Sequence, residues 1–157
     1  MRIKVLISIL AVLIGFIVIY NFYDNNRIVV REARVGIQDL PDSFEGFTIL
    51  QISDLHQKEF GKDQKRLVEK INSLDYDLIA ITGDMVNRVA NVEPFYKMLE
   101  GIKNKKHVLF IEGNSDPMDY EFGDQIGFRK SDFIKGIEER GVFFLEFPYE
   151  IKRGNDS

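Results

Sequence analysis

Polar side chains that can bind a divalent cation follow three short apolar runs of this sequence. Asp54 and His56 come after the first run, Asp84 after the second and Asn114 after the third. If the chain is still extended at the first place, Asp54 and His56 point the same way, because side chains two apart share a face. A carboxylate and an imidazole together suit a divalent metal that accepts oxygen and nitrogen ligands. The pattern indicates a metal site, although each motif alone is also ordinary turn chemistry.

These motifs act together only if the surrounding elements bring them to one place. Continuous apolar or β-branched runs predict strands at residues 28–35, 47–53, 78–82, 107–111 and 142–145. Apolar residues at helical spacing predict helices at residues 63–74, 94–102 and 131–140. Ser131 is the expected N-cap of the last helix, and Gly141 is its expected stop. Residues 146–152 are a weaker candidate for one more strand.

The alternation of strands and helices predicts an α/β fold whose mostly parallel sheet is joined by βαβ crossovers. In such sheets the ligand site lies beyond the carboxyl ends of the strands. Asp54, His56, Asp84 and Asn114 all follow predicted strands directly. The sequence therefore predicts that oxygen and imidazole ligands from three strand ends meet at one edge of the sheet.

An almost unbroken apolar segment covers residues 5–20 and follows Arg2 and Lys4. We predict a single-pass, uncleaved signal-anchor helix in the cell membrane, because the segment is nearly long enough to span a bilayer. The two positive charges favour a cytoplasmic N-terminus, which places the globular part on the extracytoplasmic side. A cleaved signal peptide and a buried core helix are the alternatives. The predicted boundaries are an anchor at 1–23, a hinge at 24–27 and the globular part at 28–157.

The composition argues against several other functions. The sequence has 21 Lys and Arg and 25 Asp and Glu, and its net charge of −4 gives no indication of a nucleic-acid partner. Because the chain has no cysteine, disulfides and thiol chemistry are excluded. Its two histidines are His56 and His107. His107 starts the third predicted strand, about 20 Å from Asn114 at about 3.3 Å per residue, and so cannot join the predicted site.

The motifs Asp-x-His at 54–56, Gly-Asp at 83–84 and Gly-Asn at 113–114 resemble those of the calcineurin-like metallophosphoesterase superfamily. With its N-terminal apolar helix, the chain is similar to the membrane-anchored bacterial branch of that superfamily, over residues 28–157. The resemblance implies the N-terminal half of a four-layer α/β/β/α sandwich. It also implies hydrolysis of a phosphomonoester or phosphodiester by a hydroxide that bridges two divalent metal ions, which could be Mn, Fe, Zn or Mg.

The resemblance also implies roles for single residues. Asp54 and His56 would hold the first metal ion, Asp84 would bridge both ions and Asn114 would hold the second. Ser115 stands where the family usually has a histidine, and a hydroxyl is a poor proton donor at neutral pH. Asp116 follows it, as in the family. The expected catalytic residues are Asp54, His56, Asp84, Asn114, Ser115 and Asp116, of which the first four are the expected metal ligands.

Two functions compete, because the family places further histidine ligands in a second half of the domain. The first is a metal-dependent phosphoesterase, present here as the N-terminal part of its domain and completed by a missing C-terminal half. The second is a non-catalytic, membrane-anchored relative that binds metal weakly. A phosphatase with an aspartyl nucleophile is disfavoured, because it would need Asp-x-Asp after the first long strand. Residues 142–149 are expected near an uncovered apolar face of the sheet.

Overall fold

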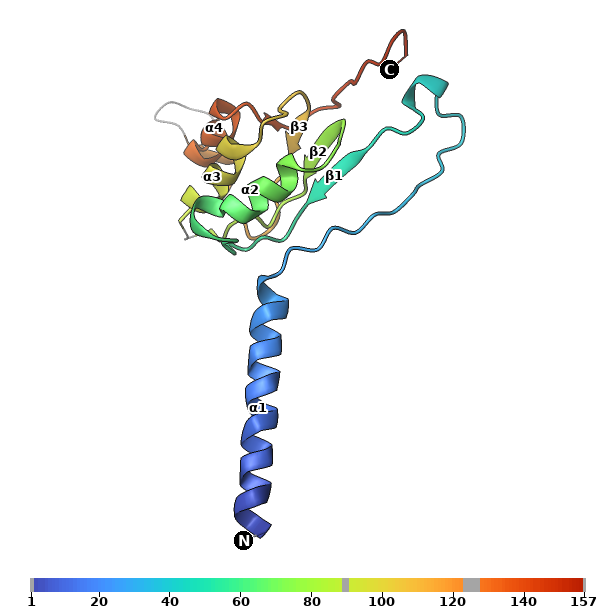
Figure 1. Ribbon diagram of the computed structural model, residues 1–157. Helices are drawn as coiled ribbons and strands as arrows, with labels where there is room; N and C mark the ends of the chain where they lie inside the picture. Colours follow the sequence, from blue (N-terminus) through green and yellow to red (C-terminus); the bar gives the residue numbers. More distant parts are fainter. Residues whose placement is uncertain (1, 89–90, 123–127, 157) are drawn as a thin grey trace. The chain divides into compact units, whose positions relative to one another are not determined.

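The computed structural model describes residues 2–88, 91–122 and 128–156 (Figure 1). The chain divides into two compact units, residues 1–34 and residues 35–157. The first unit contains one long helix. The second contains the parallel sheet and the other described helices and strands.

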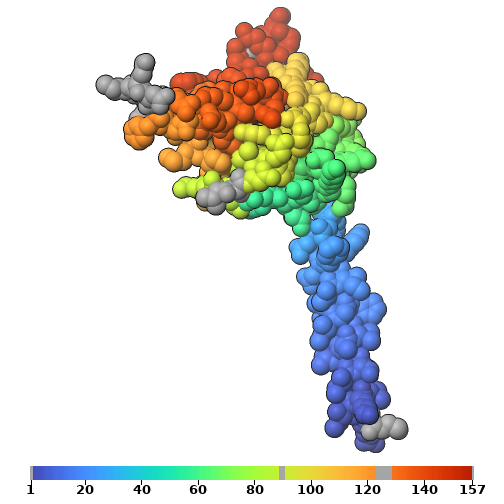
Figure 2. Space-filling model, turned by 90° about the vertical axis from the view of Figure 1, so that its left-hand side faces the viewer, coloured from blue at the N-terminus to red at the C-terminus, as the bar shows by residue number. Residues whose placement is uncertain are grey.

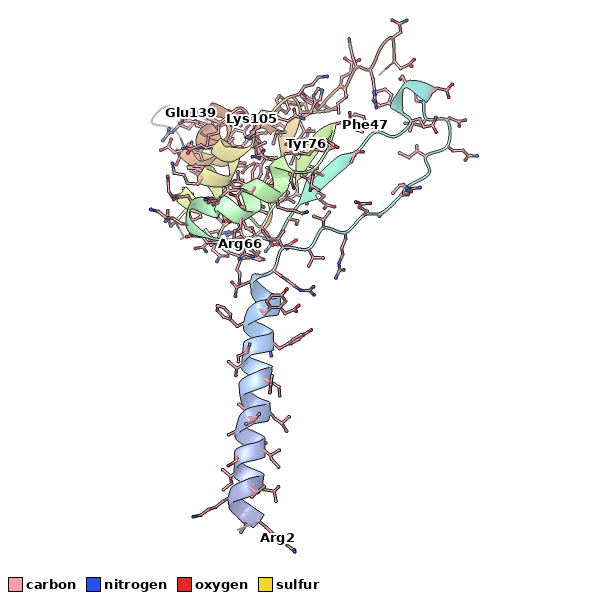
Figure 3. All side chains as sticks on the ribbon, viewed as in Figure 1. Arg2, Phe47, Arg66, Tyr76, Lys105 and Glu139 are labelled. Carbon is pink, nitrogen blue, oxygen red and sulfur yellow. The ribbon has the colours of Figure 1, made fainter. Side chains whose placement is uncertain are left out.

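Helix α1, Arg2–Asn26, has no buried residue, and its side chains project on all sides (Figure 3). At 1.5 Å per residue its 25 residues extend about 38 Å, which exceeds the hydrocarbon thickness of a bilayer. Within the described residues α1 alone is long and apolar enough to cross a membrane, and a signal sequence would meet the same criteria. The helix continues beyond the predicted end at residue 23, where the Asn26 amide donates to the Phe22 carbonyl at 2.7 Å.

The predicted strand at 28–35 is wrong. These residues have no regular secondary structure, and Val29, Val30 and Val35 are exposed, with Val35 at 80%. The β-branched run Ile28-Val29-Val30 produced the prediction. A strand, however, also needs a neighbour for its backbone N–H and C=O groups, and none of the described strands pairs with this segment.

The second unit is built on a parallel sheet of four strands in the order β1-β2-β3-β6. The strands are β1 Ile49–Ile52, β2 Leu78–Ile81, β3 Val108–Phe110 and β6 Phe143–Phe144. All three pairings are parallel and aligned in register, with Ile52 beside Ile81 and Ile81 beside Phe110. The predicted α/β class with a mostly parallel sheet is confirmed, and the carboxyl ends of β1, β2 and β3 lie side by side.

Three helices cover one face of this sheet, and they pack in the order α2, α3, α4 (Figure 1). They are α2 Lys65–Asn72, α3 Glu93–Gly101 and α4 Asp132–Glu139. The segments of α2 and α3, green and yellow in Figure 2, lie side by side. Beneath them lies a closed apolar core to which strands and helices both contribute. Its most buried members include Ile79, Ile81, Phe95, Met98, Leu99, Phe110, Ile134 and Ile137.

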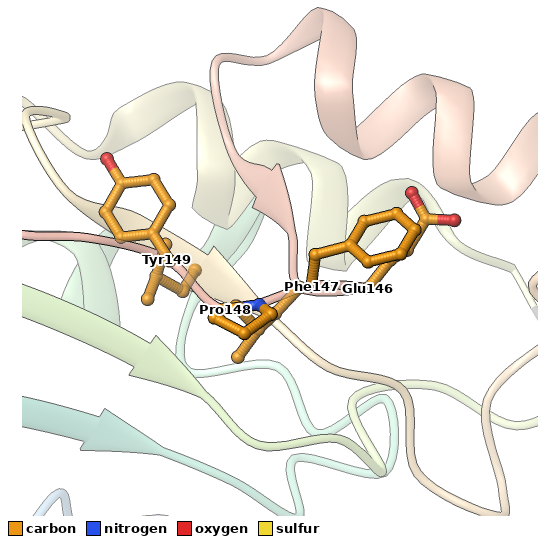
Figure 4. A pocket seen from close by; sticks show the side chains of 6 residues that line it. Glu146, Phe147, Pro148 and Tyr149 are labelled. Atoms are coloured by element: carbon orange, nitrogen blue, oxygen red, sulfur yellow. The ribbon is translucent and has the colours of Figure 1, made fainter.

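The opposite face of the sheet is uncovered in the described part of the chain. Ile49, Ile111 and Phe143 expose 58%, 44% and 45% of their surface, although all three are apolar. A hollow of about 360 Å³ lies at this side, lined by Leu109 and by residues 145–149 (Figure 4). Phe147 at its rim is 73% exposed. This is the uncovered apolar face expected near residues 142–149.

Several element boundaries differ from the prediction. Helix α2 is shorter than predicted because Asp63 and Gln64 have left-handed backbones, with φ of 54° and 59°, and form a separate 3₁₀ turn, η2 Lys62–Gln64. A second 3₁₀ turn, η1, covers Asp42–Phe44. The antiparallel hairpin of β4 Tyr120–Phe122 and β5 Phe128–Lys130 was not predicted. Residues 146–152 form no strand.

The predicted ends of the last helix are confirmed. The Ser131 hydroxyl accepts the N–H of Ile134 at 3.3 Å, as an N-cap does. Gly141 ends the helix with a φ of 76°, a left-handed conformation that glycine adopts without strain.

Candidate metal centre

Backbone pairing between β1 and β2 continues past the ends of both strands. The N–H of Asp54 donates to the Gly83 carbonyl at 3.1 Å, and the N–H of His56 donates to the Asp84 carbonyl at 3.0 Å. Gln57 donates to the Met85 carbonyl at 3.0 Å in the same way. The turn after β1 and the turn after β2 are therefore held together by backbone hydrogen bonds.

The pairing brings three candidate ligands together. His56 Nε2 lies 3.9 Å from Asp54 Oδ1 and 3.8 Å from Asp84 Oδ2. One ligand atom from each residue falls within 4.8 Å of the other two. Two donors that bind one ion at about 2.0–2.2 Å are separated by about 3.4 Å in tetrahedral geometry and by at most about 4.4 Å. The separations of 3.9 and 3.8 Å from His56 Nε2 are too long for hydrogen bonds and suit donors that share a cation.

The three candidate ligands differ in their access to solvent. The Asp54 side chain is 68% exposed, that of His56 46% and that of Asp84 19%. Asp84 is therefore the least accessible of the three, and the site is open towards solvent on the side of Asp54. A cation held by these three residues would keep coordination positions open to water.

All three residues have left-handed backbones. The φ values are 56° for Asp54, 43° for His56 and 54° for Asp84. Residues other than glycine rarely adopt this backbone conformation, and those that do concentrate at functional sites. The sequence argument assumed an extended chain through Asp54 and His56, and that assumption is wrong. The side chains converge because the backbone turns, not because it stays straight.

Two glycines let the turns after β2 and β3 touch. A methyl group on Gly83 would lie 2.6 Å from the Cα of Gly113, and a methyl group on Gly113 would lie 2.9 Å from the Cγ of Asp84. Either contact is too close for two carbon atoms. Only glycine at both positions allows the third strand end to approach Asp84.

The turn after β3 holds one oxygen of Asp84. The N–H of Ser115 donates to Asp84 Oδ1 at 2.9 Å, which leaves Oδ2 directed towards His56. Asn114 precedes Ser115 and is exposed on this turn. The structure thus brings Asp54, His56 and Asp84 into one cluster and places Asn114 on the adjoining turn.

Asp116, predicted as a catalytic residue, is 98% buried, because only 2% of its surface is exposed. Its Oδ1 accepts the N–H of Val86 at 2.9 Å, and its Oδ2 accepts the N–H of Gly113 at 2.9 Å. Both oxygens are therefore engaged with backbone groups of the two turns. At the other end of β3, His107 Nδ1 lies 3.0 Å from the Tyr149 hydroxyl, in agreement with its exclusion from the site.

Sequence reasoning gave no role to two polar side chains close to these ligands along the chain. The Ser53 hydroxyl donates to Asp54 Oδ2. Gln64 is completely buried. Apolar periodicity marks core positions and cannot indicate a buried amide, so nothing in the pattern pointed to Gln64.

Comparison with known proteins identifies one family. The family model of the calcineurin-like phosphoesterases matches residues 47–155. No curated protein matches the chain. Among solved structures, the crystal structure of phosphopantetheinyl hydrolase (PptH) from Mycobacterium tuberculosis is similar, with a TM-score of 0.38 and 20% identity. That similarity covers 66% of this chain and 36% of the hydrolase, so the chain spans about a third of the hydrolase's length.

Proposed function

The chain belongs to the calcineurin-like phosphoesterase family, and we propose that it hydrolyses a phosphomonoester or phosphodiester with the help of bound divalent metal ions. The observation that carries this proposal is the cluster of Asp54, His56 and Asp84, whose ligand atoms lie within 4.8 Å of one another. The cluster lies beyond the carboxyl ends of parallel strands, where α/β sheets bind their ligands.

The residues present fit a divalent ion. Two carboxylates and an imidazole supply oxygen and nitrogen donors, which admit Mn, Fe, Zn or Mg. We propose that Asp54, His56 and Asp84 hold one ion and that Asp84 and Asn114 contribute to a second. Asp84 suits the bridging position because a carboxylate offers two oxygens, and its Oδ2 already faces His56.

Two bound cations would activate a water molecule and neutralise charge on the phosphoryl oxygens. The residues of the chain would then orient the substrate around them. The Asn114 amide can supply a carbonyl oxygen to a cation or an N–H to a phosphoryl oxygen. The Ser115 hydroxyl is a weak proton donor, so substrates with good leaving groups are favoured.

A second candidate function is metal binding by a membrane-anchored relative without catalysis. It is favoured by the size of the ligand group, since the described residues offer one cluster of three His, Asp or Glu ligands. Two neighbouring cations repel each other and need more negative charge than two carboxylates supply.

The full-length protein, stripped of metal by a chelator and reloaded with Mn²⁺, distinguishes these functions. We expect bound Mn²⁺ and steady hydrolysis of an aryl phosphodiester that stops when the chelator is added again. Mn²⁺ binding without hydrolysis would support the second candidate. A chain that binds no Mn²⁺ at millimolar concentration would contradict both.

A further inference from the structure

Gln64 is a polar residue with no exposed surface, although it lies in a turn between the exposed Asp63 and Lys65. A buried amide is costly unless its N–H and C=O groups have partners. The partners of Gln64 therefore indicate what the burial achieves.

Both partners belong to the segment that follows His56. Gln64 Oε1 accepts the N–H of Phe60 at 3.0 Å, and Gln64 Nε2 donates to the Lys58 carbonyl at 2.7 Å. The backbone N–H of Gln64 also donates to the Gly61 carbonyl at 3.1 Å. The side chain thus pairs with the loop as a neighbouring strand would.

The start of the loop that follows His56 is held by other backbone hydrogen bonds. His56 and Gln57 donate to carbonyls of the Asp84 turn, and the N–H of Lys58 donates to the Leu55 carbonyl at 2.7 Å. The segment from His56 to Gly61 is therefore held at one end by the turn after β2 and at the other by Gln64.

We infer that Gln64 is a positioning residue that holds the loop after His56 and so keeps the imidazole directed at Asp54 and Asp84. Gln64 itself touches none of the three ligands in the contacts described. The predicted effect of Gln64 on metal affinity rests on the proposed function, whereas its predicted effect on the loop does not.

The side chain must be both donor and acceptor to do this. Methionine has similar length but neither group. Glutamate keeps an acceptor for the N–H of Phe60 but opposes the Lys58 carbonyl with a second acceptor. Both Gln64→Met and Gln64→Glu should therefore release the loop, by different chemical changes.

Asn72 provides a matched control at the far end of α2. Its Nδ2 donates to the Gly101 carbonyl at 2.9 Å, and its Oδ1 accepts the N–H of Lys103 at 3.0 Å. Asn72→Leu removes the same kind and number of hydrogen bonds as Gln64→Met, but away from the metal centre.

The experiment compares these variants in the full-length protein by Mn²⁺ titration, thermal unfolding and backbone hydrogen exchange. We expect similar losses of thermal stability for Gln64→Met and Asn72→Leu. Only the Gln64 variants should exchange residues 56–60 faster and weaken Mn²⁺ binding, by about 10–100-fold as is usual for groups behind metal ligands.

Equal Mn²⁺ affinities in all variants, or equal weakening by Asn72→Leu, would overturn the inference. If the unmodified protein binds no Mn²⁺, the proposed function fails, and hydrogen exchange alone decides the role of Gln64. Unchanged exchange at residues 56–60 in both Gln64 variants would then contradict it.

Discussion

Asp84 is the residue on which the proposed site depends most. It is the least exposed of the three candidate ligands, and one of its oxygens accepts the N–H of Ser115 while the other faces His56. Its position could be predicted from the sequence, because the register of a parallel sheet aligns strand ends. Its left-handed backbone could not, because φ at a turn depends on tertiary contacts that no local pattern records.

We predict that Asp84→Asn lowers phosphodiester hydrolysis by at least about 100-fold, because an amide carries no negative charge to a cation. Asp63→Asn is the matched control. Asp63 is exposed and has the same φ of 54°, and asparagine tolerates that backbone as well as aspartate does. Steady-state rates with Mn²⁺ measure the effect. Equal rates for Asp84→Asn and the unmodified protein would exclude Asp84 as a metal ligand.

Asp116 shows where a family motif and a local structure suggest different roles. The family resemblance implies a catalytic residue. In the structure both carboxylate oxygens accept backbone N–H groups, one from each of the turns that carry Asp84 and Asn114. We propose that Asp116 clamps these turns together, a role that motif spacing cannot show because the partners are main-chain groups.

Asp116→Asn should therefore destabilise the fold. An asparagine side chain has one acceptor oxygen, so its NH₂ group would face the second backbone N–H, and the loss should be about 1–3 kcal/mol. Chemical denaturation of the metal-free protein measures it, with the exposed Asp75→Asn as control. Unchanged stability of Asp116→Asn together with lost hydrolysis would instead favour a catalytic role.

At the scale of elements, predictions succeeded where the signal is local. Helix α4 was located by Ser131 and Gly141, whose cap and stop act within one turn of the chain. Residues 28–35 failed for the opposite reason, since a strand is defined by a partner and its own pattern is not enough. The β4–β5 hairpin was missed because each strand has only three residues, too few to show an alternation.

Gly136 lies inside α4, where glycine ordinarily weakens a helix, but the structure gives it a packing role against α3. A methyl group at this position would lie 2.6 Å from the Cζ of Tyr96. The Tyr96 hydroxyl donates to the Phe133 carbonyl at 3.0 Å, and the Arg140 guanidinium stacks on its ring at 4.0 Å. Burial raises the pKa of Tyr96 above its ordinary value, and the nearby Arg140 partly offsets this increase.

Gly136→Ala should consequently destabilise the protein, despite a gain of up to about 1 kcal/mol in helix propensity. Forcing a methyl group into a packed contact costs about 1–3 kcal/mol, so the melting temperature should fall. Gly36→Ala, where the added methyl group meets nothing within 4 Å, is the control. A higher melting temperature for Gly136→Ala would show that Tyr96 can move aside at little cost.

At the scale of the whole molecule, two large apolar surfaces are exposed to solvent in the described part of the chain. One is α1, exposed on all sides, and the other is the face of the sheet that includes Ile49 and Phe143. The apolar run of α1 and the parallel class of the sheet were both predicted from continuous apolar segments. The side of a membrane that the second unit would occupy is a separate question, because it depends on flanking charge.

We predict that α1 is an uncleaved anchor with its N-terminus in the cytoplasm and the second unit outside. Arg2 and Lys4 precede the apolar run and favour this orientation, while Arg27 and Arg31 after the helix oppose it. Protease added to intact cells should then digest the second unit. Its survival until the cells are lysed would place it in the cytoplasm.

Charge variants test the cause of that orientation. Replacing Arg27 and Arg31 with glutamine should leave the second unit outside and increase the fraction inserted this way, since it removes the opposing charge. Replacing Arg2 and Lys4 with glutamine should move part of the population to the opposite orientation, measured by the fraction that external protease cannot reach. Because both pairs of substitutions remove two positive charges, they differ only in the end of α1 that they change. Identical protected fractions for the two variants would show that flanking charge does not set the topology and that translocation of the second unit is decided elsewhere.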